Sequence, residues 1–180
     1  MESEIYMTPD KKQPLFIISG ASGVGKSAMC EILFQNETDY IVMESDILWQ
    51  EIYNTPEDNY KNYRDLWMRL CANISQIGKP VVLCGCAVPD QFENRDSRDR
   101  FTDIHYLAVV SDDGILEKRM REGRAITDEN WIKSSLDFNR WLKENADKTK
   151  PEIKLIDTSE ITPQQAANIT NEWIIKNMRK

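Results

Sequence analysis

A short segment near the start of the sequence has the residue types and spacing that bind phosphate groups. It fits the pattern G-x-x-x-x-G-K-[S/T] in full, with Gly20, Ala21, Ser22, Gly23, Val24, Gly25, Lys26 and Ser27. Glycines let such a loop curl until its backbone N–H groups face one anion. Lys26 can then reach the β- and γ-phosphates of a nucleotide, and the Ser27 hydroxyl can ligate Mg²⁺. Because a strand-like run precedes the motif and a helix-like run follows it, the sequence predicts a nucleoside triphosphate site rather than a chance glycine turn.

Two acids, in the segment Glu44-Ser45-Asp46, follow the next strand-like run. Transfer of a phosphoryl group onto a hydroxyl needs a proton acceptor and an acid near the metal. Asp46 is the better candidate for both roles, since it comes just after the strand, whereas Glu44 still belongs to the strand. The alternative is that Asp46 only caps the helix expected over residues 47–53, and capping is compatible with catalysis.

The helix expected over residues 47–53 places Asp46, Trp49 and Tyr53 on one face, because their spacing follows the helical period. Trp49 and Tyr53 can therefore wall a pocket for the phosphoryl acceptor, although such aromatic stripes are also common in helix cores. Gly85 follows a later strand and would let a substrate approach the backbone closely. No Asp ends that strand, so Ser27, water and Asp46 are left as metal ligands.

A cluster of positive charge, Glu117–Arg124, stands out in an otherwise acidic chain. Guanidinium groups suit the charge that spreads over a transferring phosphoryl group, and Arg119 and Arg124 are the first candidates for that role. Arg140, on the next helix, is a candidate clamp on the acceptor. The alternative for the cluster is a favourable charge at a helix C-terminus. Asp157, after the last strand, either borders the adenine or belongs to a plain turn.

Short apolar runs alternate with longer amphipathic runs along the whole chain. Strands are expected at residues 15–19, 40–43, 81–84, 104–110 and 153–156. Helices are expected at residues 26–35, 47–53, 59–77, 90–99, 111–121 (capped by Ser111), 127–146 and 164–177. Such alternation predicts an α/β sandwich with a mostly parallel sheet, whose ligands lie at the carboxyl ends of the strands.

The size and charge of the chain limit its function. Its 180 residues fit a single domain spanning residues 1–180. A net charge of −7 argues against an extended nucleic-acid partner. The four cysteines form no CxxC pair, and no run approaches the roughly 20 apolar residues of a membrane span. We therefore expect a cytoplasmic protein with no membrane partner.

These features together resemble the adenylate-kinase-like group of P-loop kinases, which includes shikimate and gluconate kinases. The resemblance rests on Gly20–Ser27, Glu44-Ser45-Asp46, Gly85 and Arg119–Arg124. It implies a three-layer sandwich with a five-stranded parallel sheet in the order 2-3-1-4-5, a lid at about residues 120–131, and ATP with Mg²⁺. Asp46 matches the second acid of the D-x-D pattern of the shikimate kinases, whereas Glu44 replaces the first. Cys84-Gly85-Cys86 stands where those enzymes have three glycines, so a shikimate acceptor is not expected.

The sequence thus predicts a kinase that moves the γ-phosphoryl group of ATP to a small-molecule acceptor. A nucleoside or nucleotide is favoured by Trp49 and Tyr53, which can stack on a ring. The alternative is a nucleotide-binding NTPase or switch protein without a small acceptor. That class usually needs a strand-end Asp and a residue that positions water, and neither is evident here. The oligomeric state is left open.

Overall fold

The computed structural model describes residues 12–36 and 39–178. Its centre is a parallel sheet of β1 (Leu15–Ser19), β2 (Ile41–Glu44), β3 (Val81–Cys84), β4 (Ile104–Val110) and β5 (Ile153–Asp157). The strands lie in the order β2-β3-β1-β4-β5. The expected sheet and its order are therefore confirmed, and the predicted strand bounds are correct to within one residue.

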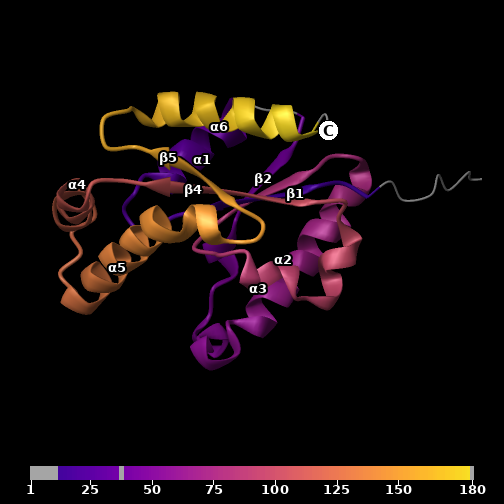
Figure 1. The fold of residues 1–180 in the computed structure, drawn as a ribbon, viewed down its shortest axis with the longest axis horizontal. Helices are drawn as coiled ribbons and strands as arrows, with labels where there is room; N and C mark the ends of the chain where they lie inside the picture. Colours follow the sequence, from indigo (N-terminus) through magenta and orange to yellow (C-terminus); the bar gives the residue numbers. More distant parts are fainter. Residues whose placement is uncertain (1–11, 37–38, 179–180) are drawn as a thin grey trace, which may run out of the picture.

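Helices cover both faces of the sheet and complete the three layers (Figure 1). One face carries α1 (Lys26–Asn36) and α6 (Pro163–Met178), while the other carries α2 (Lys61–Ile74), α3 (Asp90–Glu93) and α5 (Glu129–Asn145). Alternate residues of β1 serve the two layers: Phe16 packs in the core with α1 and α6, and Leu15 packs in the core with α2. Both residues are fully buried, as expected for the central strand of a parallel sheet.

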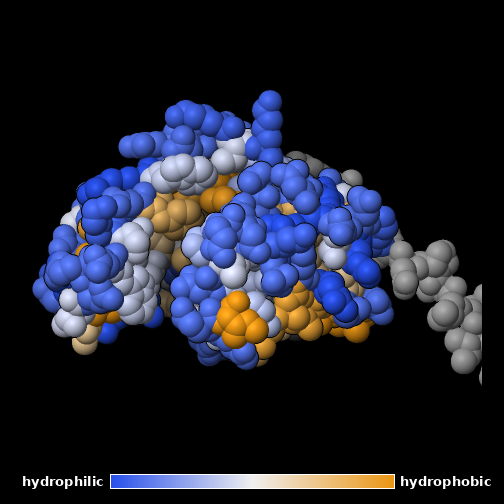
Figure 2. Space-filling view, turned by 90° about the horizontal axis from the view of Figure 1, so that it is seen from below, coloured by the Kyte–Doolittle hydropathy of each residue, from blue (hydrophilic) through white to orange (hydrophobic). Residues whose placement is uncertain are grey.

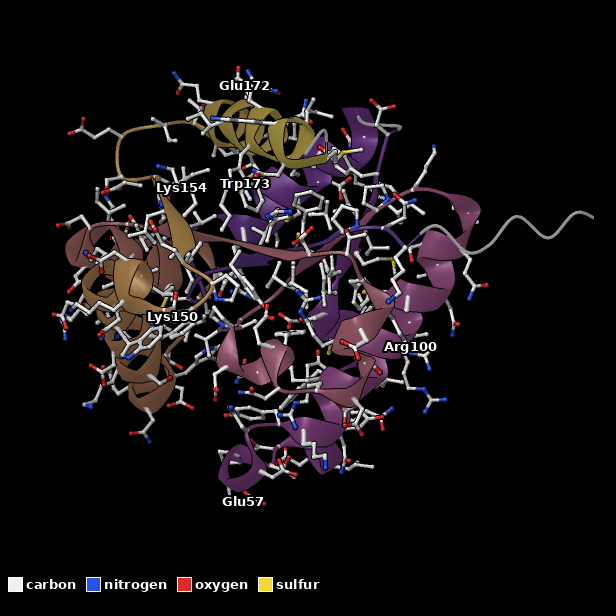
Figure 3. All side chains as sticks on the ribbon, turned by 45° about the vertical axis from the view of Figure 1, so that its right-hand side comes forward. Glu57, Arg100, Lys150, Lys154, Glu172 and Trp173 are labelled. Atoms are coloured by element: carbon white, nitrogen blue, oxygen red, sulfur yellow. The ribbon has the colours of Figure 1, made fainter. Side chains whose placement is uncertain are left out.

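The outer layers extend well away from the sheet. Glu172 lies on α6, and Glu57 lies on the short helix η3 (Pro56–Asp58) at the opposite end of the molecule (Figure 3). Trp173 points from α6 toward the sheet and packs edge-on against Phe16, with ring centroids 5.5 Å apart. His105 stacks on the same Phe16 ring at 5.1 Å, so the single histidine of the chain takes part in packing.

The prediction of a helix over residues 47–53 is wrong. Two 3-10 turns, η1 (Ser45–Leu48) and η2 (Glu51–Tyr53), replace it, and Trp49 and Gln50 are extended between them. Ile47 and Ile52 are 66% and 72% exposed, so the segment has no continuous apolar face to bury. Since most helical stability in proteins comes from packing such a face, these residues form single turns instead.

Other helices differ from the prediction mainly at their ends. Residues 59–77 form α2 followed by the 3-10 turn η4 (Ser75–Ile77), and residues 90–99 form α3 and a separate turn, η5 (Asp96–Arg100). The helix expected over residues 111–121 begins as α4 (Asp113–Lys118) and ends in one π-helical turn, η6 (Arg119–Gly123). After α5 comes the 3-10 turn η7 (Ala146–Lys148).

Ser111 is not the cap of α4, as predicted, because its neighbour takes that role. The carboxylate of Asp112 accepts hydrogen bonds from the backbone N–H groups of Gly114 and Ile115. Ser111 is fully buried, and its N–H donates to Oδ1 of Asn139 on α5 at 3.1 Å. Asn139 also donates to the carbonyl oxygen of Ser111 at 2.8 Å. One buried amide thereby attaches α5 to the end of β4.

We expect Asn139→Ala to lower the free energy of unfolding by about 2 kcal/mol, because the buried N–H of Ser111 loses its acceptor. Urea denaturation measures the change. Asn145→Ala is the matched control, since Asn145 lies on the same helix but is only half-buried and donates to the carbonyl oxygen of Trp141 one turn earlier. Equal effects of the two substitutions would contradict the role of Asn139.

Candidate phosphoryl-transfer site

The loop between β1 and α1 has the backbone that its sequence pattern predicts. Gly20, Gly23 and Gly25 have φ angles of 142°, 87° and 103°, a region that favours glycine. A Cβ atom on Gly20 would lie 2.5 Å from the carbonyl oxygen of Val109, and one on Gly23 would lie 2.7 Å from Cγ of Met120. Side chains are thus excluded at two of these positions by contact as well as by conformation.

Lys26 is folded back over this loop. Its ammonium group donates to the carbonyl oxygens of Gly20 and Ala21, at 2.6 and 2.8 Å. Ser27, in the first turn of α1, is exposed. The phosphates of a nucleotide and a Mg²⁺ ion fit this set of groups: a curled glycine loop at a helix N-terminus, a lysine and an exposed serine hydroxyl.

Arg119 supports the loop together with Thr158, a residue that the sequence analysis did not single out. The Thr158 hydroxyl donates to the carbonyl oxygen of Val24 at 2.9 Å. The Arg119 guanidinium donates to the Thr158 carbonyl oxygen at 2.8 Å and to that of Val24 at 3.4 Å. Asp157 instead faces solvent and accepts from the N–H and hydroxyl of Ser159. The contact with the phosphate loop is thus made by the residue next to the predicted one.

Arg124 reaches the phosphate loop from the segment after η6. Its guanidinium donates to the hydroxyl of Ser22 at 2.6 Å and lies 5.8 Å from the ring centroid of Trp131. Arg121 is engaged differently, because it pairs with Glu129 at 2.7 Å and with Glu117 at 2.9 Å. Of the arginines in this segment, Arg119 and Arg124 therefore contact the loop or its support.

Asp46 lies beside the turn that follows β3. A Cβ atom on Gly85 would be 1.9 Å from the Ser45 hydroxyl and 4.0 Å from the Asp46 carboxylate. The next residue, Cys86, donates from its thiol to the carbonyl oxygen of Gly20 at 3.2 Å. One turn therefore packs against Ser45, the residue before the acid, on one side and against the phosphate loop on the other.

A buried arginine, Arg64, stands behind this turn. It is 6% exposed, donates to the carbonyl oxygen of Cys86 at 2.6 Å and lies among the rings of Tyr60, Tyr63 and Phe92. Its Nε has no hydrogen-bond partner among the described residues. Burial lowers the pKa of Arg64, and the neighbouring negative charge of Asp46 opposes that shift. Sequence reasoning missed Arg64, because it resembles any charged residue of an amphipathic helix.

Trp49 and Tyr53 gather around Tyr63, although they do not share a helix face. Their ring centroids lie 5.1 and 5.4 Å from that of Tyr63, and the Tyr63 hydroxyl donates to the carbonyl oxygen of Ser45 at 2.5 Å. Trp49 is 42% exposed. The two rings thus border the Ser45–Asp46 segment through tertiary contacts rather than through helical spacing.

Arg140 is engaged away from the phosphate loop. Its guanidinium pairs with Asp113 at 2.5 Å and joins α5 to α4. Desolvation raises the pKa of Asp113, but hydrogen bonds from Arg140 and Asn139 outweigh it and hold that pKa below its usual value. The described contacts explain Arg140 as a bridge between helices.

A hollow separates the part of the molecule that contains α5 from the part that contains η2 and η3 (Figure 2).

Within residues 12–36 and 39–178, no group of three or more His, Cys, Asp or Glu side chains could hold a metal ion by itself. In the same part of the chain, no helix is long and apolar enough to cross a bilayer.

We expect Gly85→Ala to destabilise the fold by about 1–3 kcal/mol, because its Cβ would overlap the Ser45 side chain. The cost should be smaller when Gly85→Ala is introduced into a Ser45→Gly variant, which lacks the atoms in conflict. Urea denaturation of the two single variants and the double variant measures this coupling. Strictly additive effects would contradict the contact.

No protein-family model and no curated protein sequence matches the chain. Solved structures resemble it over most of its length. A gluconokinase from Sinorhizobium meliloti 1021 has a TM-score of 0.57 and 13% identity, covering 96% of each chain. A tunicamycin resistance protein from Deinococcus radiodurans has a TM-score of 0.60 and 16% identity, covering 91% of this chain and 96% of its own. A sugar kinase from a Janibacter species has a TM-score of 0.59 and 17% identity, covering 91% of this chain and 94% of its own. With its sheet order and phosphate loop, the chain has the fold of the P-loop small-molecule kinases.

Proposed function

We propose that this protein is a kinase that transfers the γ-phosphoryl group of ATP to a hydroxyl group of a small molecule. The observation that carries the proposal is the turn at Gly85-Cys86, which packs against Ser45, next to Asp46, and donates to the phosphate loop. A carboxylate held near a phosphate-binding loop suits in-line transfer to a hydroxyl, because the proton acceptor and the phosphates are then close together. The likeness to structures of kinases agrees with this proposal.

On the donor side, ATP supplies the phosphoryl group and Mg²⁺ offsets its charge. The backbone N–H groups of Gly20–Ser27 and the ammonium of Lys26 would hold the phosphates, and the Ser27 hydroxyl would ligate the metal. Arg119 has donors committed to Thr158 and Val24, so it would hold the loop in shape. Arg124 rests on a serine hydroxyl and would move to the phosphates when they bind.

On the acceptor side, Asp46 is exposed and would accept the proton of the reacting hydroxyl. Arg64, buried and bonded to the carbonyl oxygen of Cys86, would hold the turn in place beside the acceptor. The gluconokinase and sugar kinase structures favour sugars and sugar acids as acceptors. The rings of Trp49, Tyr53 and Tyr60 keep nucleosides and nucleotides among the candidates, because they can stack on a base.

We also propose that residues 120–131 act as a small lid within a single domain. Arg121 and Glu129 form an ion pair across the segment, and Ile126, which is 8% exposed, donates its N–H to the carbonyl oxygen of Met120. In the sequence, Arg124 lies between the residues joined by these two contacts. A short motion of the segment would therefore carry Arg124 over bound phosphates without unfolding the neighbouring helices.

We expect ADP release from Mg²⁺-ATP to rise with one class of acceptor in a panel of sugars, sugar acids, nucleosides and nucleotides. Lys26→Ala and Asp46→Asn should each lower the acceptor-dependent rate by about 100-fold or more, because they remove a phosphate contact and the proton acceptor. A coupled assay for ADP measures the rates.

Asp147→Asn is the control, since Asp147 is exposed in η7, just before the start of β5 and thus at the opposite edge of the sheet. Its rate should match that of the unmodified protein. ADP release that no acceptor raises, and that Asp46→Asn leaves unchanged, would instead identify an NTPase.

A further inference from the structure

We propose that Trp131 is a positioning residue that holds the guanidinium of Arg124 over the phosphate loop and so favours a triphosphate over a diphosphate. The inference rests on the proposed function, because it assumes that the loop binds the phosphates of ATP. It adds a residue that acts through Arg124 rather than on the phosphates.

Arg124 and the ring of Trp131 lie next to each other. The guanidinium carbon of Arg124 is 5.8 Å from the ring centroid, within the range of a cation–π contact. Trp131 lies in the first turn of α5, and its backbone N–H donates to the capping carboxylate of Asp128 at 3.2 Å. The ring is 46% exposed, so burial in the core does not explain its position.

The charge of Arg124 is left unpaired by acids among the described residues. Two neighbouring cations are paired with acids, Arg121 with Glu129 at 2.7 Å and Lys118 with Glu122 at 3.9 Å, and Arg119 is committed to Thr158 and Val24. Arg124 forms no such ion pair within the described part of the chain, and its contacts there are a serine hydroxyl and an indole ring. A carboxylate partner would compete with an incoming phosphate, whereas these neutral partners fix the direction of the guanidinium and leave its charge available.

Ser22, the hydrogen-bond partner of Arg124, belongs to the phosphate loop. Lys26 of that loop is the residue that reaches the β- and γ-phosphates in this motif. A guanidinium resting on Ser22 is therefore placed to meet the distal end of a triphosphate. Loss of the indole should weaken binding of ATP more than binding of ADP, because only ATP carries the γ-phosphate.

Calorimetry with the Mg²⁺ complexes of ADP and of the β,γ-imido analogue of ATP tests the inference without any acceptor. We expect the unmodified protein to bind the analogue more tightly than ADP, and Trp131→Leu to reduce that preference about two- to fivefold. Trp131→Phe should retain most of it. Arg124→Ala should abolish it, and adding Trp131→Leu to Arg124→Ala should change nothing further.

Trp141→Leu is the matched control. Trp141 is 39% exposed on the same helix, about 15 Å further along its axis, and stacks on Phe138. It should leave the preference unchanged, and thermal melts should show all variants folded. Two results would overturn this inference and leave the proposed function standing. In one, Trp131→Leu leaves the preference for the ATP analogue over ADP unchanged; in the other, Trp131→Leu lowers that preference by the same factor when Arg124 is already alanine. Failure of the unmodified protein to bind either nucleotide would overturn the proposed function and this inference with it.

Discussion

The structure of the candidate site depends on how the carbonyl groups of the phosphate loop are satisfied. The carbonyl oxygens of Gly20 and Ala21 accept from Lys26, that of Val24 accepts from Thr158, and that of Gly25 accepts from Met29 in α1. When a carbonyl oxygen of the loop points toward the protein, the N–H group of the same peptide points the other way and can face a ligand. A loop held in this way has its backbone shape before an anion binds, which favours strong electrostatic stabilisation.

The same contacts attach the loop to both halves of the sheet. Thr158 and Arg119 fasten it on the side of β5, and Cys86 fastens it on the side of β3. Because the β3 turn also packs against Ser45 at Gly85, the position of Ser45, and of Asp46 next to it, relative to the phosphate loop depends on tightly packed backbone. Parallel strands that end at one edge make this possible, since residues distant in sequence meet there.

The sequence predicted what is encoded locally, or what the resemblance to P-loop kinases supplies. The conformation of Gly20–Ser27 could be predicted because the glycine spacing lies within eight residues and a helix-like run follows directly. Thr158 could not be found in this way, since its contact with Val24 joins positions 134 residues apart. Arg64 was missed for a related reason: its burial among rings is decided by the packing of α2. The helix expected over residues 47–53 failed because spacing alone does not show that Ile47 and Ile52 would stay exposed.

The central claim is that the phosphoryl group passes to a small molecule rather than to water. Incubation with Mg²⁺ and ATP labelled at its γ-phosphate, in the presence of a mixed small-molecule extract, tests it most directly when the products are separated by chromatography. We predict that label appears in a small organic phosphate with the unmodified protein and is absent with Lys26→Ala. Label found only in inorganic phosphate, at equal levels with and without the extract, would contradict the account.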